Sequence, residues 1–165
     1  MKKLLILTML IIVFVFTVNL IPQNATDYLF LKFKNDEKFA VNEIIKVEEF
    51  DSSTLFVYKT NKGEICFIAV TKLPFNNFRI SSSAFFNSKH NDDDSEAYYC
   101  LAPKKCGYEE KDNINYFVCV RMNCKDTEAY FNDKKLKTIL IGGCLFAYNM
   151  FLNESEPKEL IFTYK

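Results

Sequence analysis

Glycine and proline are scarce in this chain, and tryptophan is absent. The 165 residues include only four Gly and four Pro and no Trp. Phosphate-cradling loops, collagen-like repeats and flexible linkers all depend on glycine or proline, so their scarcity argues against those three features. The sequence also contains no nucleophile elbow, no H-E-x-x-H pair, no Walker-type loop and no dinucleotide fingerprint. It therefore carries no motif of a common enzyme class.

Histidine is nearly absent as well. His90 is the only one, and it lies in the polar stretch from Lys89 to Glu96. A Ser-His-Asp or Cys-His arrangement would have to use it, yet a stretch without apolar residues is expected to form a surface loop. That loop also lacks the alternating oxygen ligands and the central Gly of a calcium site. We expect no catalytic, cofactor-binding or metal-binding residues here.

Paired carboxylates offer no better catalytic site. Glu48-Glu49 and Glu109-Glu110 are adjacent residues, and adjacent side chains on a strand point to opposite faces. They cannot flank one bond as the carboxylates of a glycosidase do. A non-enzymatic protein is the favoured interpretation, and a hydrolase of an unrecognised type stays open.

Neither sign of charge is in excess. Twenty-one Lys and Arg residues balance twenty-one Asp and Glu residues, and no long basic run is interleaved with aromatic residues. Proteins that bind nucleic acids usually present a basic face that neutralises phosphates. We therefore expect no nucleic acid among the partners.

One long apolar stretch is present, at the N-terminus. Lys2 and Lys3 precede residues 4–21, which are almost entirely apolar and end before Pro22. Their number is close to the roughly 20 residues that a helix needs to cross a bilayer. The apolar core of a signal peptide is usually shorter, and no pair of small side chains forms a good cleavage site here. Residues 1–22 are therefore predicted to be an uncleaved signal anchor, with a cleaved signal peptide as the alternative.

The two N-terminal lysines predict which side of the membrane the remaining chain occupies. Positive residues beside a spanning helix stay on the cytoplasmic side, so residues 24–165 are expected outside, as a single-pass protein of the cell membrane. Secretion is the alternative if the segment is cleaved. The roughly 140 residues that follow suffice for one domain. A composition that is 49% hydrophobic and 25% charged is typical of a folded chain.

The extracytoplasmic part is predicted to begin with a helix. Residues 24–38 open with Asn24, Thr26 and Asp27, which are good N-caps, and they carry apolar residues at helical spacing. The pattern predicts one short amphipathic helix.

A hairpin is the clearest strand signal. Residues 54–60 and 64–72 are rich in apolar and β-branched residues, and Asn61-Lys62-Gly63 joins them as a short turn. The second strand is apolar at both alternating sets of positions, which indicates that both faces are covered. It is therefore expected to be central in its sheet.

Further strands are expected in the C-terminal half. The candidates are Phe78–Phe86, Asn115–Met122, Leu136–Ile141, Cys144–Leu152 and Leu160–Tyr164. The predicted fold class is α+β: an N-terminal membrane helix, one short helix, and then a mostly antiparallel β-sheet domain.

The hairpin resembles a known group of proteins. Leu55-Phe56-Val57-Tyr58-Lys59, a turn with Gly63, and then Ile65 to Val70 are similar to the strand pair of small uncharacterised exported proteins of Gram-positive, spore-forming bacteria. Those proteins carry a Phe-Tyr-Lys followed by Gly-x-Ile, and Val57 stands here in place of an aromatic residue. The resemblance implies a hydrophobic leader, a helix and a C-terminal half of strands. It implies no activity and no site.

Six cysteines follow the apolar segment, as an oxidising compartment permits. Cys100 and Cys106 flank a turn that contains proline. Cys119 and Cys124 flank four residues, so local closure is geometrically simple for both pairs. These four are candidate disulfide cysteines, with buried free thiols as the alternative.

The other two cysteines favour a different state. Cys66 lies within an apolar strand and Cys144 follows two glycines, so both are expected to be buried free thiols. The cysteine spacings do not match a zinc site.

Two functions are consistent with these features. The first is a non-enzymatic binding or interaction protein at the outer membrane surface, where aromatic residues such as Phe75, Phe78, Phe85 and Phe86 meet an unknown protein or envelope ligand. The alternative is a secreted, disulfide-stabilised effector, toxin or immunity-type protein.

Overall fold

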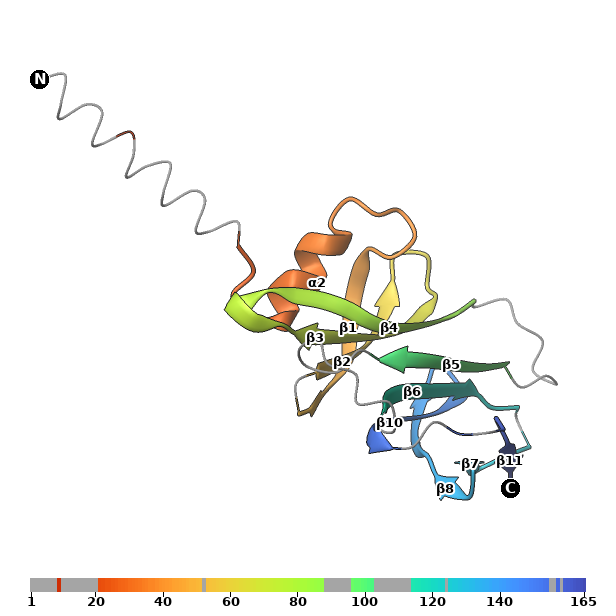
Figure 1. The fold of residues 1–165 in the computed structure, drawn as a ribbon. Helices are drawn as coiled ribbons and strands as arrows, with labels where there is room; N and C mark the ends of the chain where they lie inside the picture. The colour runs from red at the N-terminus through yellow and green to blue at the C-terminus, as the bar shows by residue number, and fades with distance from the viewer. Residues whose placement is uncertain are drawn as a thin grey trace, which may run out of the picture.

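Strands dominate the domain, with one short α-helix (Figure 1). The computed structural model describes residues 9, 21–51, 53–87, 96–102, 114–123, 125–154, 157 and 159–165. In chain order the elements are α2 (Ala25–Phe33), β1 (Val41–Phe50), β2 (Ser53–Thr60), β3 (Ile65–Lys72), the 3₁₀ turn η1 (Pro74–Asn76), β4 (Phe78–Phe86), β5 (Glu96–Ala102), β6 (Ile114–Arg121), β7 (Ala129–Phe131), β8 (Lys134–Lys135), β9 (Lys137–Ile141), β10 (Cys144–Glu154) and β11 (Phe162–Tyr164).

The strands form three sheets, in which every pairing is antiparallel. The first sheet has the order β1-β2-β3-β4, the second β5-β6-β10-β9, and the third β11-β7-β8. This confirms the prediction of one short helix followed by a mostly antiparallel β domain. The predicted hairpin is β2-β3, and β3 is central, between β2 and β4.

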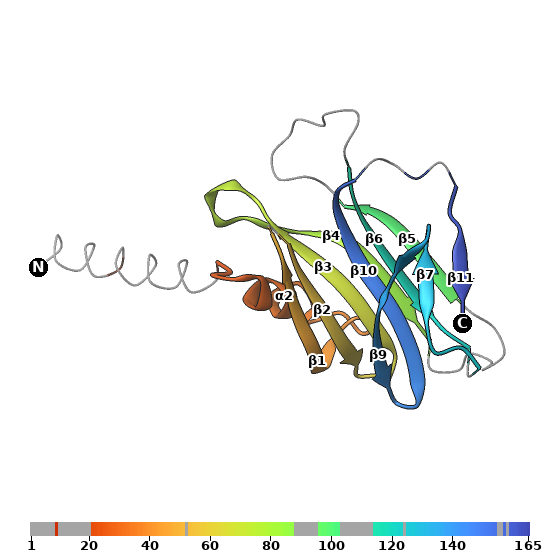
Figure 2. The ribbon, with the colours of Figure 1, turned by 90° about the horizontal axis from the view of Figure 1, so that it is seen from below.

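The elements stack in layers, which Figure 2 shows from below. The first and second sheets face each other across a core to which both contribute. Helix α2 packs on the outer face of the first sheet, and the small third sheet packs on the outer face of the second. Both large sheets are therefore buried on two faces, which explains why their central strands carry apolar residues at both alternating sets of positions.

The short helix begins where the sequence predicted. Asn24 caps it, because its side-chain oxygen accepts a hydrogen bond from the Asp27 backbone N–H at 2.8 Å. Leu29 and Phe33, four residues apart on one face, are buried against the outer face of β2 and β3. The helix covers a surface of the sheet that would otherwise be apolar and exposed.

Strand β2 contributes side chains to two hydrophobic clusters, one on each face of its sheet. Leu55 and Val57 point toward the second sheet, whereas Phe56 and Tyr58 point toward the helix. This is the two-residue alternation of a strand with apolar residues on both sides. The turn to β3 uses Gly63 at φ +83°, a backbone conformation that suits glycine.

Aromatic rings fill the space between the two large sheets. The Phe67 ring of β3 lies 5.6 Å from the Phe146 ring and 5.5 Å from the Tyr148 ring, both on β10. Phe86 of β4 lies 5.1 Å from Phe146 and 4.9 Å from Tyr98 of β5. These centroid distances are those of favourable aromatic pairs, so the cluster joins the two sheets.

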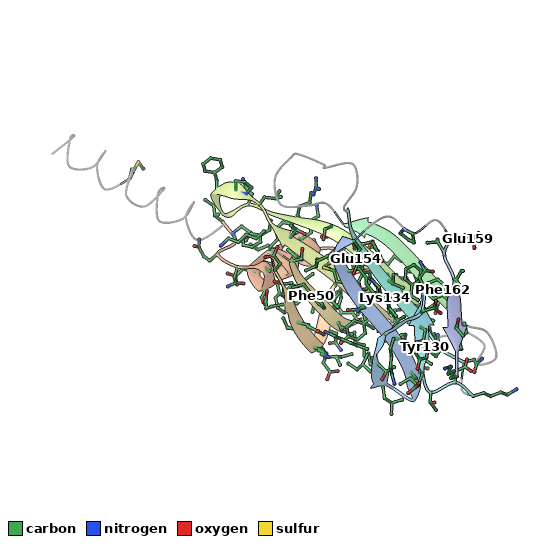
Figure 3. The ribbon with its side chains drawn as sticks, turned by 60° about the horizontal axis from the view of Figure 1, so that its bottom comes forward. Phe50, Tyr130, Lys134, Glu154, Glu159 and Phe162 are labelled. Carbon is green, nitrogen blue, oxygen red and sulfur yellow. The ribbon has the colours of Figure 1, made fainter. Side chains whose placement is uncertain are left out.

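The third sheet is held by aromatic rings and by the ion pairs Lys134–Glu154 and Lys135–Glu128. Phe131 of β7 lies 5.0 Å from Phe162 of β11, and Lys134 pairs with Glu154 at 2.6 Å. Figure 3 shows Tyr130, Lys134 and Phe162 beside β10, on the side away from the first sheet. This small sheet therefore shields the outer face of the second sheet.

The predicted membrane anchor lies almost wholly outside the described residues. Of residues 1–20 the structure describes only Met9. Among the described residues, no helix has the length and apolar character needed to cross a bilayer. The anchor over residues 1–22 and the domain boundary after it stay predictions.

Removing the central ring of the core should destabilise the fold strongly. Phe67 is fully buried and contacts rings of both sheets, so Phe67→Ala is expected to lower the free energy of unfolding by about 3–5 kcal/mol. Leu140 is 69% exposed, and Leu140→Ala should change it by less than about 0.5 kcal/mol. Chemical unfolding of the full-length chain measures both, and equal losses would contradict this description of the core.

Candidate functional site

A pocket opens at one end of the two facing sheets. Its volume is about 440 Å³, within the range of ligand sites of roughly 300–1,000 Å³. It lies where the β2–β3 turn approaches the β9–β10 turn. The lining residues are the apolar Ile45, Ile65, Phe86, Leu140, Ile141 and Phe146, the polar or charged Glu43, Lys59, Asn87, Arg121 and Cys144, and Gly63 and Gly142.

The alternation of β6 places Arg121 at the base of this pocket. Phe117 and Cys119 point into the core between the sheets, and Arg121 is the next residue in the same series. The inward-facing series of β6 is therefore apolar up to Cys119, and it continues with the cation Arg121 where the core ends. It remains only 5% exposed.

The acceptors of Arg121 among the described residues are neutral groups. Its Nη1 donates to the backbone oxygen of Asn87 at 2.8 Å, and its Nη2 donates to Sγ of Cys144 at 3.1 Å. Within the described part of the chain no carboxylate forms an ion pair with it. Strand pairing sets Glu96 of β5 opposite Arg121, but the Glu96 side chain lies outside the described ones. A buried cation is costly without a negative partner, and an anion in the pocket would offset that cost.

The rest of the pocket combines an apolar wall with a charged rim. Ile45, Ile141 and Phe146 belong to the wall, and exposed Lys59 and Glu43 stand at the rim. Among the described lining residues, Glu43 is the only carboxylate. The arrangement can hold a small molecule that carries an anionic group at one end and apolar atoms at the other.

Cys144 adds a thiol to this pocket. It is half-buried, and the structure records it as a free cysteine, as it does the fully buried Cys66. Free thiols were expected at both positions. Sequence reasoning expected Cys144 to be buried, whereas its Sγ is bonded to Arg121 at the pocket wall. It is therefore the natural chemical probe of this site.

Cys66 is a poor nucleophile. Burial is the main cause that raises the pKa of its thiol, to about 12, and the nearby Glu64 carboxylate adds to the effect. A hydrogen bond with Tyr58 acts in the opposite direction but does not compensate. The thiol therefore stays protonated at neutral pH and serves packing between β3 and the helix.

A second polar cluster ties β1 to the second sheet. The Tyr148 hydroxyl accepts a hydrogen bond from Lys46 Nζ at 2.6 Å and donates one to Glu48 Oε2 at 3.0 Å. Lys137 of β9 also donates to Glu48. Because these residues come from both large sheets, the cluster closes the side of the domain where β1 and β9 meet.

This cluster shifts the ionisation of its members. The hydrogen bond to Tyr148 is the main cause that raises the pKa of Lys46 above its usual value. Partial burial by itself would raise the pKa of Glu48, but hydrogen bonds from Lys137 and Tyr148 outweigh it, so the pKa is lowered. Its neighbour Glu49 faces away and accepts a hydrogen bond from Thr54 at 2.9 Å. The two glutamates do not form a catalytic pair.

Several predicted features lie outside the described side chains. Those of Cys100, Cys106 and Cys124 are among them, as are His90 and the acidic stretch around it. Cys119 is buried in the core between the sheets. The two local disulfides therefore stay predictions. Among the described residues, no group of three or more His, Cys, Asp or Glu side chains could hold a metal ion.

The exposed aromatic residues were predicted with mixed success. Phe75 is 97% exposed, Phe78 and Phe85 are half-buried, and Phe86 is 1% exposed. The expectation that Phe86 meets a partner is wrong, because it points inward from β4 into the ring cluster. Phe75 alone stands free of the fold.

Compared with known proteins, the chain matches no family model, no curated protein and no solved structure. The resemblance to exported proteins of spore-forming bacteria stays a prediction. Any function must therefore be argued from the pocket and the surfaces themselves.

Replacing Glu48 tests the cluster that joins β1 to the second sheet. Glu48→Gln should lower the free energy of unfolding at pH 7 by about 1–2 kcal/mol, because charge-assisted hydrogen bonds are lost. The pKa of Glu48 is lowered in the folded state, so the wild-type advantage is complete above the unfolded pKa and disappears as the pH falls through the folded one. Unfolding curves of both proteins between neutral pH and pH 3 measure this.

The matched control is Glu159→Gln, at an exposed position that Figure 3 shows at the edge of the domain. It should change stability by less than about 0.5 kcal/mol. A pH-independent difference between wild type and Glu48→Gln would contradict the assigned ionisation.

Proposed function

We propose that this chain is a membrane-anchored, extracytoplasmic binding protein without catalytic activity, and that the pocket around Arg121 is its ligand site. The observation that carries the proposal is Arg121, which is 5% exposed, lines a cavity of about 440 Å³ and, among the described residues, donates hydrogen bonds only to neutral acceptors. An anion-binding role would explain why the apolar residues on the inward face of β6 are followed by the cation Arg121.

The ligand class follows from the lining. A carboxylate or phosphate group would bond the N–H groups of Arg121 that have no acceptor among the described residues. The apolar part of the ligand would contact Ile45, Ile141 and Phe146. The shared chemistry is that of a small organic anion, with Lys59 at the rim favouring its approach.

The position of the pocket suits an anchored protein. It lies at the Ile65 end of β3, whereas the start of α2 lies near the opposite end of the first sheet, since the Tyr28 ring is 6.0 Å from the Phe78 ring. Figure 2 shows the β9–β10 turn and the start of α2 at separate ends of the domain. If residues 4–21 span the membrane, the pocket opens away from it.

Among the described residues, the lining of the pocket contains no nucleophile paired with a base, which supports a binding role over hydrolysis. The described lining residues offer one thiol and one rim carboxylate but no histidine beside the thiol. A nucleophilic mechanism needs a base within hydrogen-bond reach of the nucleophile, and the partner of Cys144 is a guanidinium, which donates only.

The pocket is tested with benzoate and inorganic phosphate as probes on the full-length chain in detergent. Either anion should raise the melting temperature of the wild type, because a ligand of the folded state stabilises it. Benzamide, which matches benzoate in shape but is neutral, should not. Arg121→Gln should weaken anion binding about 10- to 100-fold, since charge-assisted hydrogen bonds are lost.

Lys59→Gln is the matched control, because it removes a cation from the exposed rim and should retain most of the binding. A second readout is the rate at which N-ethylmaleimide alkylates Cys144, mapped by peptide mass. The bound anion should slow that rate, while Cys66 stays unlabelled. Equal melting shifts in wild type and Arg121→Gln, or no shift with either anion, would contradict the proposal.

A further inference from the structure

The β3–β4 turn exposes an apolar ring that the fold does not use. Phe75 stands at its tip, is 97% exposed and has φ +61°, a left-handed conformation that is unfavourable for a residue with a side chain. Two backbone hydrogen bonds hold the turn in this shape: the Leu73 N–H donates to the Asn77 oxygen and the Asn77 N–H donates to the Pro74 oxygen. The domain therefore presents the ring outward at a conformational cost and gains no packing from it.

Both charged residues within the turn segment itself are basic. The segment from Thr71 to Ile80 contains Lys72 and Arg79 and no acidic residue. Both side chains are exposed, and they lie on the paired ends of β3 and β4, below the tip. An aromatic ring with flanking cations is the combination that favours the interface of a membrane with anionic lipids.

The turn lies where the chain enters the domain. The rings of Tyr28, in the first turn of α2, and of Phe78, at the start of β4, are 6.0 Å apart. Ile21, the first residue of the continuous described chain, precedes the helix by four positions and is 55% exposed. Figures 1 and 2 both show the β3–β4 turn beside this entry segment.

We infer that the β3–β4 turn is a second membrane contact, in which the Phe75 ring enters the interface of the bilayer and Lys72 and Arg79 lie near lipid phosphates. The inference rests on the proposed anchoring by residues 4–21, because a spanning segment that ends there would bring the bilayer surface to this end of the domain. The partner is the lipid surface of the anchoring membrane.

Two membrane contacts would give the domain a fixed orientation, whereas a single anchor leaves it free to rotate. An anchor alone joins the domain to the membrane through a short segment of chain. A second contact at Phe75 would make β3 point away from the membrane surface. The eight residues of this strand rise about 26 Å. The Arg121 pocket, at the far end of that strand, would then face the external medium.

The chain offers a clean optical test because it has no tryptophan. Phe75→Trp places the only tryptophan of the chain at the tip of the turn. Leu140→Trp is the matched control, since Leu140 is 69% exposed on β9 and lines the pocket at the opposite end. Both full-length variants are reconstituted into vesicles of phosphatidylcholine and phosphatidylglycerol, and flotation shows whether the chain is bound.

The inference predicts that bromine-labelled lipids quench the tryptophan at position 75 several-fold more than the one at position 140. Aqueous iodide should show the reverse order. Exchanging phosphatidylglycerol for phosphatidylcholine should reduce the quenching at position 75, because the basic residues then lose their partners.

Three results would overturn the inference in distinguishable ways. If the chain floats with the vesicles but iodide quenches position 75 as strongly as position 140, anchoring stands and the second contact does not exist. If position 75 is protected from iodide without bromine quenching, and the protection depends on protein density, a second copy of the chain covers the turn. If the chain does not float, the proposed anchoring fails together with the inference.

Discussion

The layer of aromatic rings between the two large sheets is the contact on which the rest of the structure depends. Phe67 and Phe86 belong to the first sheet, Phe146 and Tyr148 to the second, and their ring centroids lie 5.1–5.9 Å apart where they meet. Because these rings hold the sheets face to face, each sheet keeps one outer face that must be covered separately. Helix α2 covers one and the small third sheet the other. The same layer ends at Arg121, and that end is the pocket.

Much of the strand order could be predicted because a strand that is buried on both faces has apolar residues at both alternating sets of positions. In β3 both alternating sets of side chains are apolar, which placed it correctly at the centre of its sheet. Strand β1 gave no such signal, since it is an edge strand rich in Glu and Lys, and two register shifts break its alternation. The two-residue β8 depends on tertiary contacts that no local pattern encodes.

The candidate site was largely invisible to sequence reasoning. Arg121 was read only as part of the spacer between Cys119 and Cys124. The available signal was the alternation of β6, which places the cation on the same face as Phe117 and Cys119. That signal shows a buried charge, but the neutral partners of Arg121 and the approach of the β9–β10 turn arise only from the packing of separate strands. Phe75 was named correctly as exposed, whereas Phe86 could not be distinguished from it by residue type.

The central claim is that Arg121, at the end of the core between the two large sheets, binds a small anion. Its most direct test is native mass spectrometry of the chain, purified from its native source under non-denaturing conditions. The account predicts a chain that carries a small ligand, which denaturation removes and whose fragments reveal a carboxylate or phosphate group. It further predicts that Arg121→Gln, purified in the same way, carries none. The mass of the bare polypeptide for the wild type, or the same bound ligand in both proteins, would contradict it.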